Sequence, residues 1–204
     1  LNLPVVENFV PVSALLAEPE GNYHESVLEI TTVPVGQYQG LYEKVWSVDS
    51  DALAESGGAA ISDAEGWYRI SGHDDLQYLI QDGDGGYFLW KFMCFDCGQY
   101  PYKDVLELVY QIHSADDITE IVVDPATMDN TEEGKAIQAE IGTHRVTDRD
   151  EIETLYQILA AMTCYGEDNW DRIHLGMTDG EDGSHRAVRL ARYLTLVTDY
   201  GNEI

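Results

Sequence analysis

Basic residues are scarce in this sequence. Its 204 residues include 11 lysines and arginines against 38 aspartates and glutamates, so the formal net charge is −27. Nucleic acids and anionic membranes are bound largely through Lys and Arg side chains, which neutralise phosphates and attract anionic lipids. The charge therefore argues against a nucleic-acid partner and against direct membrane binding. It fits a solvated acidic surface, a salt-adapted protein, or a surface that attracts cations or a basic partner.

Cysteine is equally scarce, with three residues at Cys94, Cys97 and Cys164. An odd number is poor support for a disulfide framework. Cys94 and Cys97 form a C-x-x-C and are the candidate disulfide or thiol pair. A structural zinc site would need a second such pair, and a thioredoxin-like motif would need a strand-to-helix junction in a βαβ unit. Cys164 is expected to pack as a small hydrophobe in the last turn of a helix.

Long apolar runs and catalytic motifs are also lacking. No run of apolar residues is long enough to span a membrane, and no basic segment followed by an apolar one opens the chain. We expect that both ends were trimmed from a longer protein. The sequence contains no H-E-x-x-H, G-x-S-x-G, P-loop or Rossmann glycine pattern. We therefore predict no catalytic residue, no metal ligand and no cofactor.

Two acidic, glycine-rich segments, 82–86 and 179–183, resemble calcium loops only in passing. Each lacks either a third ligand before its glycine or the bidentate Glu at position twelve, so we predict hairpin turns. The one concentration of basic residues lies at 185–192. Its arginines are a candidate anion-binding group, with pairing to neighbouring acids as the alternative; they are Arg186, Arg189 and Arg192.

Aromatic residues are abundant, with 13 Tyr and 4 Trp, and supply a core. The best-defined element is a helix across 147–166, with Thr147 as its N-cap and Gly166 as its stop. Its apolar residues recur at helical spacing and are expected to pack on a sheet; they are Ile152, Leu155, Ile158, Leu159 and Met162.

The remaining pattern predicts an α+β fold: a mostly antiparallel sheet with hairpins, packed against two or more amphipathic helices. A further helix is expected at 102–112. Residues 131–142 are ambiguous: Thr131 suits the cap of a short helix that ends at Gly142, but Gly134 disfavours it. Residues 41–46 suit either a helical turn or a strand. Strands are expected at 27–33 (ended by Pro34), 67–70, 76–81, 87–94, 118–123, 143–146, 170–175 and 188–197. Residues 1–22 read as an extended segment or linker. Residues 23–204 read as a single α+β domain, with subdomains 23–98 and 99–204 as a further division.

Several short segments in the second half of the chain form a recognisable set: Tyr100–Tyr102, His113–Ile118, Asp124–Thr131, Ile141–Thr143, Thr163–Gly166 and Arg192–Thr198. Together they resemble poorly characterised extracytoplasmic domains of Gram-positive gut bacteria. Some of those domains are lipoproteins, and others are C-terminal extensions of membrane antirepressor metallopeptidases that sense β-lactams. Neither the peptidase zinc motif nor a penicillin-binding Ser-x-x-Lys occurs here, so the resemblance implies location and architecture and no reaction.

These observations predict a non-enzymatic, extracytoplasmic sensor or binding domain for an unknown ligand or protein. Any membrane contact is expected only through a tether outside this chain. The alternative is a carboxylate-based hydrolase acting on cell-wall glycan, because a glycosidase pair is defined by separation in space and not by sequence spacing. A third interpretation is a purely protein-interaction domain, which would show a large exposed apolar or aromatic patch.

Overall fold

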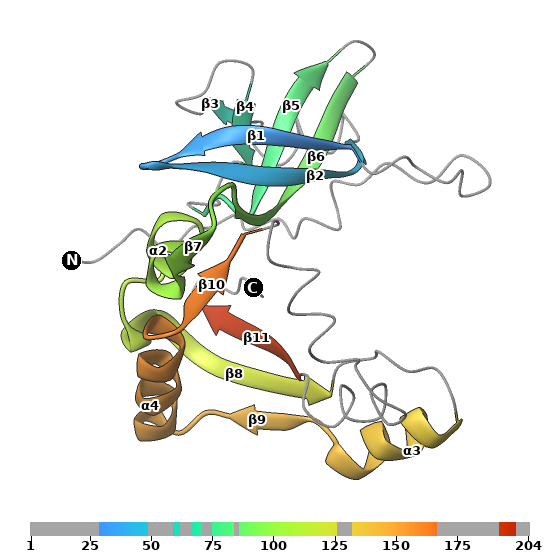
Figure 1. The fold of residues 1–204 in the computed structure, drawn as a ribbon, viewed down its shortest axis with the longest axis vertical. Helices are drawn as coiled ribbons and strands as arrows, with labels where there is room; N and C mark the ends of the chain where they lie inside the picture. The colour runs from blue at the N-terminus through green and yellow to red at the C-terminus, as the bar shows by residue number, and fades with distance from the viewer. Residues whose placement is uncertain are drawn as a thin grey trace.

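The structure, a computed structural model, describes residues 29–48, 59–61, 67–70, 75–83, 86–125, 132–166 and 192–198. It contains two main antiparallel sheets, joined by a short two-stranded ribbon (Figure 1). The expected combination of mostly antiparallel sheet and helices is confirmed. Strand predominates, with 53% of the described residues in strands against 27% in helices.

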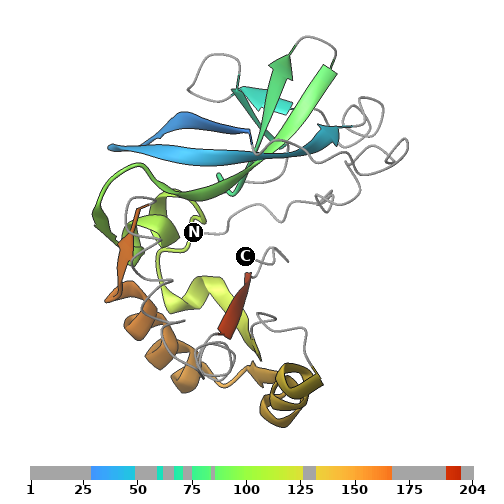
Figure 2. The ribbon, with the colours of Figure 1, turned by 45° about the vertical axis from the view of Figure 1, so that its right-hand side comes forward.

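The larger sheet has six strands in the order β1-β2-β6-β5-β4-β3 and curls into a half-barrel (Figure 2). Its strands are β1 (Ile30–Val35), β2 (Tyr38–Val48), β3 (Ala59–Ile61), β4 (Trp67–Ile70), β5 (Tyr78–Gly83) and β6 (Gly86–Phe95). The hairpin predicted around residues 82–86 is confirmed, because β5 pairs with β6 as far as Gly83 and Gly86. β6 lies between β2 and β5, which explains why its sequence is apolar on both faces.

Two predictions near the start of this sheet are settled by the pairing of β1 with β2. Pro34 does not end the first strand, which continues to Val35. β1 is the outermost strand of its sheet, where a residue without an N–H is tolerated. Residues 41–46 form part of β2 and no helical turn. The turn between the strands uses Gly36 at φ +58°, a conformation that favours glycine.

The smaller sheet has three strands in the order β11-β8-β9: β8 (Ile118–Pro125), β9 (His144–Val146) and β11 (Arg192–Thr198). It packs with α4 (Arg149–Ala160) and the 3-10 turn η2 (Ala115–Asp117) around a mostly aliphatic cluster. The buried members are Leu106, Ile112, Ala115, Ile118, Ile121, Ile152, Tyr156, Leu159 and Leu196. The ambiguous segment 131–142 forms a helix, α3 (Glu132–Ile141). Gly142 follows it at φ +68° and donates its N–H to Gln138, as expected for a C-terminal glycine.

A ribbon of β7 (Gln99–Pro101) and β10 (Thr163–Tyr165) lies between the sheets, beside α2 (Tyr102–Leu108). The ribbon approaches the turn after β6 very closely. A Cβ on Gly166 would meet the carbonyl oxygen of Cys97 at 1.9 Å, so this position requires glycine. Tyr102 and Tyr110 pack against both the aliphatic cluster and the buried core of the larger sheet, which is rich in aromatic side chains. The division into two subdomains stays a prediction.

The predicted helix at 147–166 is present but shorter at both ends. Asp148, and not Thr147, is its N-cap: the carboxylate accepts from the backbone N–H groups of Asp150 and Glu151 at 3.0 and 3.1 Å. The helix ends at Ala160, and the segment that contains Cys164 forms β10. The hydrogen bonds to β7 favour a strand here, although the spacing of apolar residues predicts a helix.

The side of α4 that packs inward also differs from the prediction. Ile152 and Leu159 are buried as expected, and Leu155 is half-buried. Ile158 and Met162 are exposed instead, and Tyr156 takes their place in the core. The helix predicted at 102–112 likewise stops at Leu108, although Val109 and Ile112 beyond it are fully buried.

Some predictions fall on residues that the structure does not describe. They are the extended segment 1–22, the strand 170–175, the turn 179–183 and the first part of the strand 188–197. Among the described helices, none has the length and apolar character needed to cross a membrane.

Candidate functional site

A row of side chains crosses the six-stranded sheet perpendicular to its strands. Lys44 of β2 pairs with Trp90 of β6, Trp90 with Leu79 of β5, and Leu79 with Arg69 of β4. Directly paired residues of antiparallel strands project from the same face of a sheet. The register therefore places two cations on either side of one indole.

A second row lies next to the first on the same face. Phe88 pairs with Ser47 on one side and with Gln81 on the other, and Gln81 pairs with Trp67. We call Lys44, Arg69, Phe88 and Trp90 the sheet-face site. Phe88, Arg69 and Lys44 are half-buried, and Trp90 is buried.

Lys44 is the best-defined cation of the sheet-face site. Its ammonium lies 3.8 Å from the centroid of the Phe88 ring and 5.9 Å from that of Trp90. It also pairs with the carboxylate of Glu29 at 3.0 Å. Such a cation–π contact contributes about 0.5–1 kcal/mol at an exposed site and more where water is excluded. The aromatic rings therefore hold the ammonium over the face.

Trp90 contributes a polar atom that the fold does not satisfy. Its Nε1 is buried, and within the described part of the chain it is the buried side-chain polar atom without a hydrogen-bond partner. The indole is fixed by edge-to-face contact with Trp67, with ring centroids 5.5 Å apart. A buried donor without an acceptor costs about 1–3 kcal/mol. The sheet-face site therefore contains a donor that an added acceptor would satisfy.

The cysteines lie at the junction of the two sheets. All three carry reduced thiols: Cys94 is buried at the end of β6, and Cys97 and Cys164 are half-buried. Cys164 pairs with Tyr100 across the β7–β10 ribbon. Burial, together with the nearby Cys94 thiol, raises the pKa of Cys164 to about 11. Burial also raises the pKa of Cys97, with a smaller effect of Asp96. Both thiols are thus protonated at neutral pH, the less reactive state.

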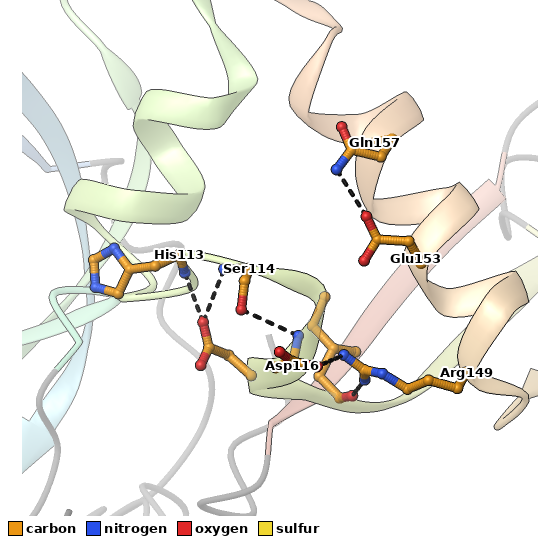
Figure 3. A network of polar contacts seen from close by, with 8 residues as sticks. His113, Ser114, Asp116, Arg149, Glu153 and Gln157 are labelled. Atoms are coloured by element: carbon orange, nitrogen blue, oxygen red, sulfur yellow. Dashed lines mark hydrogen bonds and ion pairs between the residues drawn. The ribbon is translucent and has the colours of Figure 1, made fainter. Parts of the chain in front are cut away.

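A polar network holds η2 against α4, and Figure 3 shows it from close by. The carboxylate of Asp117 accepts from the backbone N–H groups of His113 and Ser114 at 2.8 and 2.9 Å. Arg149 donates to the carbonyl oxygen of Ile118 at 3.0 Å and also to the carboxylate of Asp116. These bonds satisfy backbone groups at both ends of η2, so the network is structural.

The structure does not bring the other predicted site residues together. Arg192 lies exposed on β11, while Arg186 and Arg189 fall outside the described residues. The tip of the 82–86 turn and all of 179–183 also fall outside them. Among the residues that are described, no group of three or more His, Cys, Asp or Glu side chains is placed to hold a metal ion.

Sequence reasoning did not find the sheet-face site. Lys44 and Arg69 lie far apart in the chain, and only the pairing of four strands brings them onto one row. The available signal was a lysine next to aromatic residues on strands in a chain with only 11 basic residues. Searches of protein-family models, curated proteins and solved structures give no match to this chain.

Proposed function

We propose that this chain is a non-enzymatic binding domain of an extracytoplasmic protein, tethered to a membrane through a segment outside the chain. The sheet-face site binds the ligand. The observation that carries the proposal is the buried indole N–H of Trp90, which has no acceptor among the described residues and lies in one row with Lys44 and Arg69. Aromatic surfaces with a few placed polar groups are typical of ligand sites.

The chemistry of this face favours a glycan that carries carboxylate and amide groups. Aromatic rings offer flat apolar surfaces to the C–H faces of sugars, and an indole N–H donates to a carbonyl oxygen. Lys and Arg side chains pair with carboxylates. Because Trp90 is buried, such a ligand would first contact the half-buried Phe88 and Lys44. Fragments of cell-wall glycan combine all three groups.

The test is the binding of soluble peptidoglycan fragments to the full chain, followed by calorimetry. Trp90→Phe keeps an aromatic ring, smaller than the indole, and removes the N–H, and we expect it to weaken binding about fivefold to tenfold, the value of one neutral hydrogen bond. Lys44→Met should weaken binding by a similar factor. Lys103→Met is the matched control, since Lys103 lies on α2 in a pair with Glu107. Equal affinity in all four proteins, or no binding at all, would contradict the sheet-face site.

The hydrolase alternative rests on Asp75. Among the described residues Asp75 is the buried carboxylate, 5% exposed, and its Oδ1 accepts from the backbone N–H of Gln77 at 3.0 Å. A glycosidase needs two carboxyl groups at a defined separation. Assaying the same fragments for new reducing ends separates the two functions. Cleavage that is lost in Asp75→Asn supports the hydrolase, and binding without cleavage supports the binding domain.

The proposed location has an independent test. The full-length gene is expected to encode an upstream lipobox, signal sequence or membrane helix. A gene that begins and ends with this segment and encodes no such element rejects the tethered location, whatever the binding assay gives.

A further inference from the structure

Glu29 supplies the carboxylate that contacts Lys44 of the sheet-face site. Its Oε2 lies 3.0 Å from the Lys44 ammonium, and its backbone carbonyl oxygen accepts from the backbone N–H of Lys44 at 2.9 Å. Glu29 directly precedes β1, and the backbone bond continues the pairing of β1 with β2. The pairing of these two strands therefore brings the carboxylate and the ammonium together.

The Lys44 ammonium has a second source of attraction besides Glu29. It lies 3.8 Å from the centroid of the Phe88 ring and 5.9 Å from that of Trp90, at distances where a ring attracts a cation. The side chain of Glu29 is 57% exposed, against 28% for Lys44. An ion pair with one partner so exposed contributes little to stability. The Glu29 carboxylate is therefore not needed to keep the ammonium over the rings.

The Glu29 carboxylate is also the same chemical group that the proposed ligand offers to Lys44. A ligand carboxylate that approaches the ammonium either displaces Glu29 or shares the three N–H donors with it. Displacement breaks an existing ion pair, and sharing brings two negative groups close together, where they repel. In both cases Glu29 opposes the binding of an anionic ligand. A neutral ligand, which makes no ion pair with Lys44, meets no such opposition.

We propose that Glu29 is a specificity-determining residue of the sheet-face site, an internal carboxylate that competes with the carboxylate of the ligand for Lys44. It lowers the affinity for anionic glycan fragments and leaves the affinity for neutral ones unchanged. The site therefore discriminates less between charged and neutral fragments than Lys44 would without Glu29. The inference rests on the proposed function, because it concerns the same site and the same class of ligand.

The experiment measures the binding of two probes to the full chain by calorimetry. One probe is a disaccharide-peptide fragment of peptidoglycan with free carboxylates, and the other is the same fragment with those carboxylates amidated. Glu29→Gln keeps the size of the side chain and removes its charge. We expect this variant to bind the free-acid fragment about twofold to fivefold more tightly than the wild type, in the range of an exposed ion pair. Its affinity for the amidated fragment should not change.

Glu43→Gln is the matched control, because it removes one negative charge from the residue next to Lys44 on β2. Successive side chains of a strand point to opposite faces, and Glu43 is paired across the sheet with Lys91, outside the sheet-face site. This control should bind both fragments as the wild type does. Glu29→Gln combined with Lys44→Met should bind as Lys44→Met alone, since no ammonium remains to compete for. Thermal unfolding should show Glu29→Gln to be as stable as the wild type.

Several outcomes would overturn this role of Glu29 and leave the sheet-face site in place. They are unchanged or weaker binding of the free-acid fragment by Glu29→Gln, an equal gain with the amidated fragment, and an equal gain in Glu43→Gln, which would assign the effect to net charge. In each of these cases Lys44→Met still weakens binding. A different result, no binding of either fragment by the wild type or any variant, would reject the proposed function and this inference with it.

Discussion

The two sheets of this molecule are filled by different kinds of side chain. The six-stranded sheet has a core of rings, with Phe95 stacked on Tyr38 at 4.3 Å and in edge contact with Phe92 and Tyr100 at 5.2 and 5.0 Å. The three-stranded sheet has a mostly aliphatic core, in which Tyr156 is the sole buried ring among the described residues. Polar contacts at the surface stabilise it further: the caps of η2 and α4 and the network of Figure 3.

The difference shows where a binding function is accommodated more readily. Aromatic side chains bury a large area and still carry polar groups that need partners, as the unpaired indole N–H of Trp90 illustrates. Aliphatic side chains carry none. The six-stranded sheet therefore combines stability with unused hydrogen-bonding capacity.

The largest expected effect breaks the aromatic core at its centre. Phe95 is fully buried and contacts three rings, so Phe95→Ala should lower the free energy of unfolding by about 3–5 kcal/mol. Ile152→Val in the aliphatic core is the mild reference and should cost about 0.5–1.5 kcal/mol. Chemical denaturation of both variants measures these values. A Phe95→Ala protein as stable as the Ile152→Val protein would show that the rings are not the main support of the larger sheet.

Alkaline pH should act on the tyrosines where the two cores meet. Burial raises the pKa of Tyr102 from 10.0 to about 12, and burial also raises the pKa of Tyr42, Tyr100 and Tyr110. A raised pKa in the folded state means that the unfolded chain ionises first. The contribution of Tyr102 to the free energy of unfolding is therefore complete below pH 10 and is lost as the pH rises towards 12.

Tyr102→Phe isolates this contribution. The variant should lose less stability than the wild type between pH 10 and 12, by about 2–3 kcal/mol for a shift of this size. Denaturation series at pH 8 and at successive alkaline values provide the measurement. Identical pH profiles for the two proteins would argue that Tyr102 ionises as freely in the folded chain as in the unfolded one.

The smallest of these effects concerns the outer support of the aliphatic region. Asp117→Ala removes the acceptor of two backbone N–H groups, those of His113 and Ser114, and should cost about 1–2 kcal/mol. Asp116→Ala is the neighbouring control. It removes an exposed ion pair with Arg149 and should cost less than about 1 kcal/mol. Thermal unfolding ranks the two variants, and the reverse order would reject this assignment of roles.

Local signals predicted many of the elements well. The turn residues at 82–86 marked the hairpin of β5 and β6, and Gly142 marked the end of α3, because each depends on a few neighbouring residues. Contacts between distant segments were not predictable. Thr163–Tyr165 has the spacing of a helix end, but its partner is the strand β7, far away in the sequence.

The candidate sites were harder to predict than the fold, for a related reason. The apolar stripe predicted for the helix at 147–166 includes Ile158 and Met162, but periodicity reveals neither that the helix ends at Ala160 nor how much of a stripe the sheet will cover. Likewise, a sequence contains Lys44, Trp90 and Arg69 without the register that aligns them. The resemblance to extracytoplasmic domains says nothing about how the strands pair, and it stays a prediction.

The close approach at Gly166 bears on the order in which the chain folds. β7 and β10 are adjacent in space, but α2, β8, α3, β9 and α4 lie between them in the sequence. Pairing them closes a long loop, and the entropy lost in that closure is recovered only after the intervening elements have become compact. We therefore expect the ribbon to form late, after the β5–β6 hairpin and α4. A side chain at position 166 would then slow the last step of folding and leave the earlier ones unchanged.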